Sequence, residues 1–187
     1  MSKHLIFAGA ALIALSACQK KAEPANTVDN MTVDTNSAAA DPAADTSPLT
    51  LSDADKSFLE EAIKGDIGEV QIGQLAADKG QSDAAKSFGQ TLATDHGIHR
   101  GQLLALAQRA GMTQPTQSSP EAAKNYAQLQ AASPKQFDAV FKGMMVEDHE
   151  KDIAKYQKHA AGTGPLADMA KTTVPVLQKH LELAKAL

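Results

Sequence analysis

Residues 82–111 read SDAAKSFGQTLATDHGIHRGQLLALAQRAG, and this stretch decides the fold of the chain. Its apolar residues recur at alternating spacings of four and three, which is the period of an amphipathic helix. The serine that opens the stretch is a good N-cap, and the glycine that closes it is a good helix end. The apolar residues form a stripe along one side of this helix. Near the middle of the stretch, the stripe is interrupted or bordered by ionisable residues, namely Asp95, His96 and His99. We therefore expect a long helix that carries ionisable groups into the interior of the protein.

Three more long helices and one short helix are expected from the same kinds of signal. The first long helix has a start that resembles a capping box, and the short helix and the last two long helices each have a proline at their start. No segment alternates with period two between turn signals, so we expect no strands and an all-α fold. The expected long helices span 52–80, 82–111, 133–162 and 165–187, and the short helix begins at 119.

The lengths of the connections predict how these helices are arranged. The first and third connections are tight, whereas the second, from Gly111 to Ala132, is long and contains the short helix. Two helical hairpins joined by one long crossover form the ferritin-like version of the four-helix bundle. A plain up-down bundle with a decorated loop is the alternative.

A ring of ionisable side chains is expected at one level inside this bundle. Each member lies close to the middle of its helix, so the set converges whichever way the helices run. An unpaired buried polar or charged group costs several kcal/mol. The ring must therefore form a hydrogen-bonded network or hold a metal ion, and the sequence leaves both open. The candidate ligands are Glu69, His96, His99, His149 and His180.

The composition of this ring narrows the choice of metal. Ferritin-like di-iron proteins use a Glu from two helices and a Glu-x-x-His pair from each of the other two. Here Glu69 stands alone on its helix, and Asp148-His149 replaces one such pair. A histidine-rich set favours zinc, copper or a single iron. His149-Glu150 begins like a zinc-protease motif, but Ile153 occupies the position of the second histidine, so that reading fails.

The N-terminus predicts export and lipidation. Residues 1–4 form a short basic segment, and residues 5–15 form an apolar run that is too short to span a bilayer. This is the pattern of a signal peptide. The sequence Leu15-Ser16-Ala17-Cys18 resembles the bacterial lipobox. That resemblance implies a signal peptide over 1–17 and a mature chain that starts at an acylated Cys18. Gln19, rather than Asp, follows the cysteine, which resembles an outer-membrane sorting signal.

The rest of the chain divides into a linker and one domain. Residues 18–50 are rich in Ala, Asp, Asn, Thr, Ser and Pro and lack aromatic residues, which is typical of a disordered linker. Residues 51–187 form the helical bundle domain. The formal net charge of −4 and the lack of a basic patch argue against nucleic acid as a partner. The expected location is the cell envelope, with the lipid on Cys18 anchoring the protein to the outer membrane, facing the periplasm.

Several segments of the domain resemble a known family. They lie around Phe58, Glu69, Asp95-His96, Phe137, His149 and the stretch from Pro175 to His180. They are similar to a bacterial envelope family of ferritin-like domains, domain of unknown function 4142, whose members are often labelled outer-membrane proteins. The resemblance covers residues 51–187 and implies a ferritin-like helical fold and export, without an established activity.

Two functional hypotheses follow. The favoured one is a lipid-anchored envelope bundle that is not an enzyme and acts through a protein partner in the envelope or in a stress response. The alternative is a metal-binding ferritin-like protein that uses the His/carboxylate ring.

The lipid anchor can be tested directly. Cys18→Ser should leave the precursor uncleaved by the lipoprotein signal peptidase, because that enzyme acts on the lipidated cysteine. Mass spectrometry of the mature N-terminus should show a thioether-linked lipid on Cys18. An unmodified N-terminus downstream of Cys18 would contradict the prediction.

Overall fold

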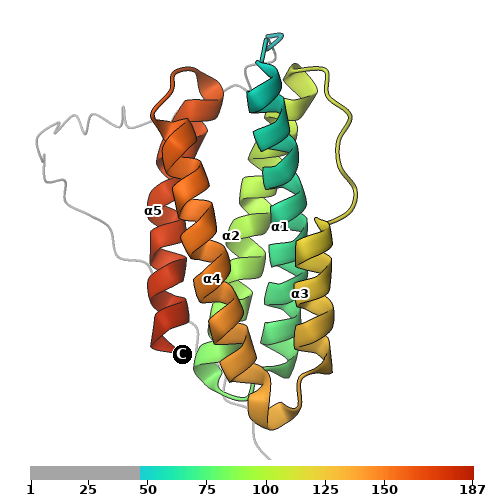
Figure 1. Cartoon of the computed structure of the whole chain (residues 1–187), viewed down its shortest axis with the longest axis vertical. Coiled ribbons are helices and arrows are strands. Elements are labelled where there is room, and N and C mark those ends of the chain that lie inside the picture. The colour runs from blue at the N-terminus through green and yellow to red at the C-terminus, as the bar shows by residue number, and fades with distance from the viewer. Residues whose placement is uncertain (1–46) are drawn as a thin grey trace, which may run out of the picture. The chain divides into compact units, whose positions relative to one another are not determined.

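The protein, described here from a computed structural model over residues 47–187, forms five helices and no strand within that range (Figure 1). Cys18, the predicted signal peptide and most of the predicted linker lie outside the described residues. The helices are α1 (Asp53–Lys79), α2 (Asp83–Arg109), α3 (Pro120–Ala131), α4 (Pro134–Ala160) and α5 (Pro165–Ala186).

Local signals in the sequence explain where the helices begin. The side chains of Ser52, Ser82 and Ser119 each accept a hydrogen bond from the backbone N–H three residues further on. These bonds satisfy donors that the first turn of a helix leaves unpaired. The helices α3, α4 and α5 each have a proline in their first turn, where its fixed φ suits the helix. Each expected helix is therefore present, with ends within a few residues of those predicted.

The arrangement is the crossover type of four-helix bundle. The helices α1 and α2 form one antiparallel hairpin, and α4 and α5 form another (Figure 1). The segment between the hairpins travels the length of the bundle, so α2 and α4 run in the same direction. Within this segment α3 packs mainly against α1 and also contacts α4. The ferritin-like prediction is thus confirmed over the plain up-down alternative.

A layer of polar residues divides the hydrophobic core. One apolar cluster lies towards the α1–α2 connection and includes Phe88, Phe137 and Phe141. A second lies towards the other end and includes Phe58 and Tyr156. Buried polar residues occupy the helix segments between the two clusters, at the level that the sequence predicts. These residues are Asp66, Glu69, His96, His149, Thr173 and His180.

Contacts of the bundle begin slightly before the predicted start of the domain. The backbone N–H of Leu49 donates a 2.9 Å hydrogen bond to the carbonyl of Arg109 at the end of α2. Leu49 and Leu51 also pack against the apolar cluster around Phe58. The last residues assigned to the linker therefore lie against the bundle.

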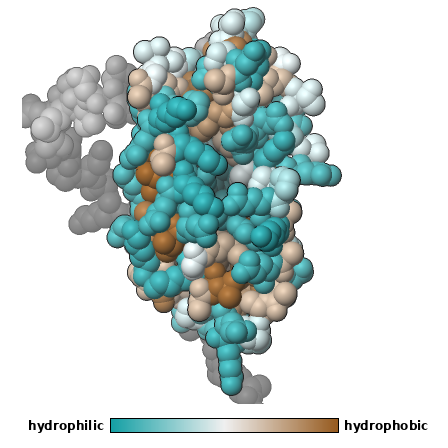
Figure 2. All heavy atoms as spheres, viewed as in Figure 1, coloured by the Kyte–Doolittle hydropathy of each residue, from teal (hydrophilic) through white to brown (hydrophobic). Residues whose placement is uncertain are grey.

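One face of the described residues is mainly polar. Hydrophilic residues predominate on the face seen in Figure 2, and hydrophobic residues form small separate patches there. None of the described helices combines the length and the apolar character needed to cross a bilayer.

The close approach of α1 and α2 depends on two glycines and gives a stability prediction. A Cβ on Gly73 would lie 2.7 Å from the carbonyl oxygen of Gly89 and 2.8 Å from the backbone nitrogen of Ala93. Gly73→Ala should therefore push the helices apart and lower the free energy of unfolding by about 1–3 kcal/mol. Gly101→Ala is the matched control, because a Cβ there meets nothing within 4 Å. It should raise the free energy of unfolding by up to about 1 kcal/mol through helix propensity. Urea unfolding measures both, and equal stability of the two variants would contradict this account of the packing.

Candidate functional site

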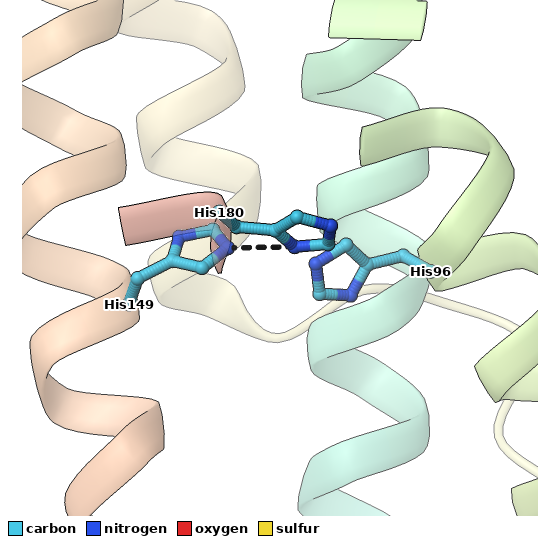
Figure 3. A group of neighbouring side chains, drawn as sticks. All are labelled: His96, His149 and His180. Atoms are coloured by element: carbon cyan, nitrogen blue, oxygen red, sulfur yellow. Dashed lines mark hydrogen bonds between the residues drawn. The ribbon is translucent and has the colours of Figure 1, made fainter. Parts of the chain in front are cut away.

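Three buried histidines from three helices meet in the polar layer. They are His96 on α2, His149 on α4 and His180 on α5, with 5%, 1% and 1% of their surface exposed. One ring nitrogen of each lies within 4.8 Å of the corresponding nitrogens of the other two. Figure 3 shows the three rings turned toward a common point. We call this group the three-histidine cluster.

His149 is held as a neutral ring with one free nitrogen. Its Nδ1–H donates a 2.9 Å hydrogen bond to the carbonyl of Met145, one turn earlier on α4. A carbonyl only accepts, so the proton of the neutral ring is on Nδ1 and the lone pair is on Nε2. Burial, helped by the nearby rings of His96 and His180, lowers the pKa of His149 to about 3. The ring is therefore neutral at pH 7.

His180 is held in the opposite tautomer. Its Nε2–H donates a 2.9 Å hydrogen bond to Oδ2 of Asp95 on α2. Burial lowers the pKa of His180, and its effect exceeds the opposing effect of Asp95. The lone pair of this neutral ring is then on Nδ1, which lies 3.4 Å from Nε2 of His149 (dashed line in Figure 3). In these tautomers both facing nitrogens carry lone pairs, an arrangement that a cation between them would stabilise.

His96 completes the cluster from the other side. Its Nδ1–H donates a 2.8 Å hydrogen bond to Oδ1 of Asp66, and its Nε2 is buried without a hydrogen-bond partner. Figure 3 shows this ring with its second nitrogen turned toward His180. Burial by itself lowers the pKa of His96, but the hydrogen bond to Asp66 and the charge of Glu69 outweigh burial and raise it. With a pKa of about 9 the ring is protonated at pH 7, so Nε2 becomes a metal ligand when its proton leaves.

Asp66 is a site residue that the sequence analysis missed. Its carboxylate is 4% exposed and accepts hydrogen bonds from Nδ1 of His96 and Nδ1 of His99, each 2.8 Å long. Burial would raise its pKa, but these two bonds outweigh burial and lower it, so Asp66 is ionised. A signal was available, because Asp66 lies three residues before Glu69 and so shares its face of α1.

The other two predicted ring members lie near the cluster but outside it. Nε2 of His99 lies 3.0 Å from Sδ of Met169, and its Nδ1 is bonded to Asp66. Glu69 is 6% exposed, and its Oε2 has no hydrogen-bond partner. Burial raises the pKa of Glu69 to about 8, against the charge of His96. Of the five predicted residues, the structure therefore brings His96, His149 and His180 together.

The geometry of the cluster fits a tetrahedral metal ion. Zinc binds imidazole nitrogen at about 2.0–2.1 Å, so two nitrogens on one tetrahedral ion lie about 3.4 Å apart. Nε2 of His149 and Nδ1 of His180 have this separation, 3.4 Å. The nitrogen of His96 lies within 4.8 Å of the other two, so it would need to approach them by up to about 1.4 Å to bind the same ion. The second nitrogen of every ring is bonded to an oxygen acceptor, the arrangement that orients histidine ligands in metal proteins.

The same residues do not fit a di-iron centre. Such a centre needs several carboxylates as bridging and terminal ligands. In this bundle Asp66 and Asp95 bind the outer nitrogens of the histidines instead. Glu69 is the one glutamate among the buried residues of the described chain. The site therefore offers three histidine nitrogens and one open coordination position, and His96, whose pKa is raised to about 9, loses a proton when it binds an ion.

Comparisons with known proteins agree with the fold and identify the family. No match was found among curated protein sequences. The crystal structure of a DUF305 fragment from Deinococcus radiodurans is similar, with a TM-score of 0.66 and 14% identity over 74% of this chain and 97% of that chain. At that identity the likeness concerns the fold alone. A family model described as "Domain of unknown function (DUF4142)" matches residues 39–187. As the resemblance implied, the chain belongs to the DUF4142 family of domains of unknown function.

Proposed function

We propose that this protein binds one divalent transition-metal ion in the cell envelope, with His96, His149 and His180 as ligands. The proposal adopts the metal-binding alternative of the sequence analysis and needs no enzymatic activity. The bound ion would keep one exchangeable position, because the chain supplies three ligands in a buried layer.

One observation carries the proposal: Nε2 of His149 and Nδ1 of His180 face each other at 3.4 Å, and the oxygen partners of the other two ring nitrogens leave a lone pair on each. The hydrogen bonds from His149 to Met145 and from His180 to Asp95 fix both tautomers. A network of neutral histidines would place a donor opposite an acceptor here. Two opposed lone pairs and the unpartnered Nε2 of His96 instead match three ligands that converge on one cation.

Zinc is the ion that best suits this donor set. Three imidazole ligands favour zinc, copper or nickel over magnesium or calcium, which prefer oxygen. The nitrogen–nitrogen separation is that of a tetrahedral site, and tetrahedral coordination is typical of zinc. Copper(II) should bind more tightly than zinc in solution, because affinities of nitrogen sites follow the Irving–Williams order.

The envelope location rests on the sequence alone. The lipobox-like segment ending at Cys18 supports a lipid anchor, and the predicted linker would hold the bundle away from the bilayer. The domain contains no cysteine, so its proposed metal site does not depend on a thiolate and suits an oxidising compartment.

Metal binding is tested by calorimetry on the mature protein purified without a polyhistidine tag and stripped with a chelator. The protein should bind one equivalent of zinc. His149→Ala and His180→Ala should each weaken binding by at least 100-fold, because each removes one of only three ligands. His99→Ala should bind zinc nearly as well as the parent, because His99 faces Met169 rather than the cluster.

His159→Ala serves as the control for loss of an imidazole outside the polar layer, since His159 stacks on Phe58. Absence of saturable zinc binding by the parent would refute the proposal. So would a His149→Ala variant that binds zinc as tightly as the parent.

The metal-free protein should also lose stability in acid because of His149. The pKa of His149 is about 3 in the folded state, against a usual value near 6.5. As the pH falls from 6.5 toward 3, the unfolded chain takes up a proton that the folded chain does not. The free energy of unfolding should therefore decrease in this window, by at most about 1.4 kcal/mol per pH unit from this group. In the His149→Gln variant the free energy of unfolding should decrease less steeply with falling pH. Urea unfolding of both proteins at pH 7, 5.5 and 4.5 measures this. The same dependence on pH in the parent and the variant would contradict the assignment of a neutral His149.

A further inference from the structure

A cavity of about 550 Å³ lies beside the three-histidine cluster. It is bounded by α1, α4 and the beginning of α3, on the side where α1 and α4 make few contacts. Its wall includes His96, so the cavity reaches the cluster itself. The other groups that matter here are Glu69, Asp148 and Asp152.

Two unpartnered atoms border this cavity. They are Oε2 of Glu69 and Nε2 of His96, the two buried side-chain atoms of the described residues that have no hydrogen-bond partner. A polar atom buried in this way costs about 1–3 kcal/mol. A carboxylate oxygen and an imidazole nitrogen are both ligands for a divalent cation. Glu69 and His96 therefore give the wall of the cavity two cation ligands, and His96 also belongs to the three-histidine cluster.

The interior of the cavity is acidic. Asp148 accepts a 3.1 Å hydrogen bond from the side-chain amide of Asn125, and Oδ1 of Asp152 lies 3.7 Å from Nζ of Lys155. Burial, and to a lesser extent the charge of Asp152, raises the pKa of Asp148 to about 6.

The other lysines along this cavity are paired with carboxylates nearer the surface. Lys151 contacts Glu121 and Glu147 at 2.9 Å each, and Lys64 pairs with Glu60. Only the Lys151–Glu121 pair joins α4 to α3, and the other two lie within α4 and α1. These pairs engage the two lysines and leave Asp66, Asp148 and Asp152 as an excess of carboxylates along the cavity. A cleft of one sign attracts ions of the opposite sign and raises their rate of entry.

A second cavity, of about 280 Å³, reaches the cluster from the side of α2 and α5 and is a poorer route. On that side His180 presents its Nε2–H, already bonded to Asp95, while its lone pair points toward His149. The exposed apolar residues Ile98 and Val176 also line this second cavity. A hydrated cation that enters here would meet a protonated ring edge and apolar side chains.

We propose that the acidic cavity is a capture site for the incoming divalent ion and that Glu69 is the carboxylate that passes the ion to His96. The inference rests on the proposed function, because it concerns the route to the same three ligands. The ion exchanges water for an oxygen of Glu69 and then exchanges that oxygen for the histidine nitrogens. Any proton on Glu69 or on Nε2 of His96 leaves to solvent. Glu69 is thus a positioning residue that binds the ion transiently.

The test separates rate from affinity. Cobalt(II) is mixed with the chelator-stripped mature protein in a stopped-flow instrument, and its visible absorption reports arrival in the four-coordinate site. Glu69→Gln keeps the side-chain volume and removes the carboxylate. It should slow both entry and release by about tenfold, in the range of electrostatic effects on association. The equilibrium Kd should change by less than about threefold, because both rates fall together.

Two control variants make the result specific. Glu182→Gln makes the same substitution on the exposed surface of α5 and should leave both rates unchanged. Val176→Trp obstructs the second cavity without removing a ligand and should also leave both rates unchanged.

The outcomes distinguish this inference from the proposed function. Suppose that the parent binds cobalt and zinc, but cobalt enters the Glu69→Gln variant as fast as it enters the Glu182→Gln variant. The capture role is then wrong and the metal site stands. If Glu69→Gln abolishes binding at equilibrium, Glu69 is a permanent ligand and the capture role is wrong. If Val176→Trp slows entry, the route is the second cavity. If the parent binds no metal, the proposed function itself fails.

Discussion

The structure depends on satisfying the outer nitrogen of each buried imidazole. Three histidines at the centre of a helical bundle would be costly if their ring nitrogens had no partners. Asp66, the Met145 carbonyl and Asp95 each accept a hydrogen bond from one ring. These three bonds fix the tautomers and hold the rings in place. The bond between His180 of α5 and Asp95 of α2 also links the two helical hairpins, between the two apolar clusters.

The fold was largely predictable from the sequence, because its determinants are local. Serine caps, prolines in first turns and the spacing of apolar residues set the helix starts, and the length of the second connection set the topology. The level of the polar layer was predictable for the same reason, since a residue's height depends only on its position along its helix. Packing of α1 against α2 through Gly73 and Gly89 was not predictable, since it depends on how two helices approach each other.

The site was predictable in part. Spacing along α2 placed both His96 and His99 near the centre, and both reach the same carboxylate, Asp66. Their second nitrogens nevertheless diverge, one toward His180 and the other to Met169. Residues three apart on a helix differ by about 60° in direction, which is enough to send two rings to different partners. Side-chain direction and hydrogen-bond partners, unlike height in the bundle, cannot be derived from periodicity.

The use of aspartates as hydrogen-bond acceptors has an electrostatic consequence. A divalent ion bound by three neutral histidines keeps its two positive charges, which are costly to bury alone. Asp66 and Asp95 lie directly behind two of the ligands and supply the opposing negative charge. Without the ion, Nε2 of His96 and Oε2 of Glu69 remain buried and unpartnered, which lowers the stability of the bundle. Any ion that removes this penalty binds the folded state in preference to the unfolded chain, so the polar layer couples metal binding to folding stability.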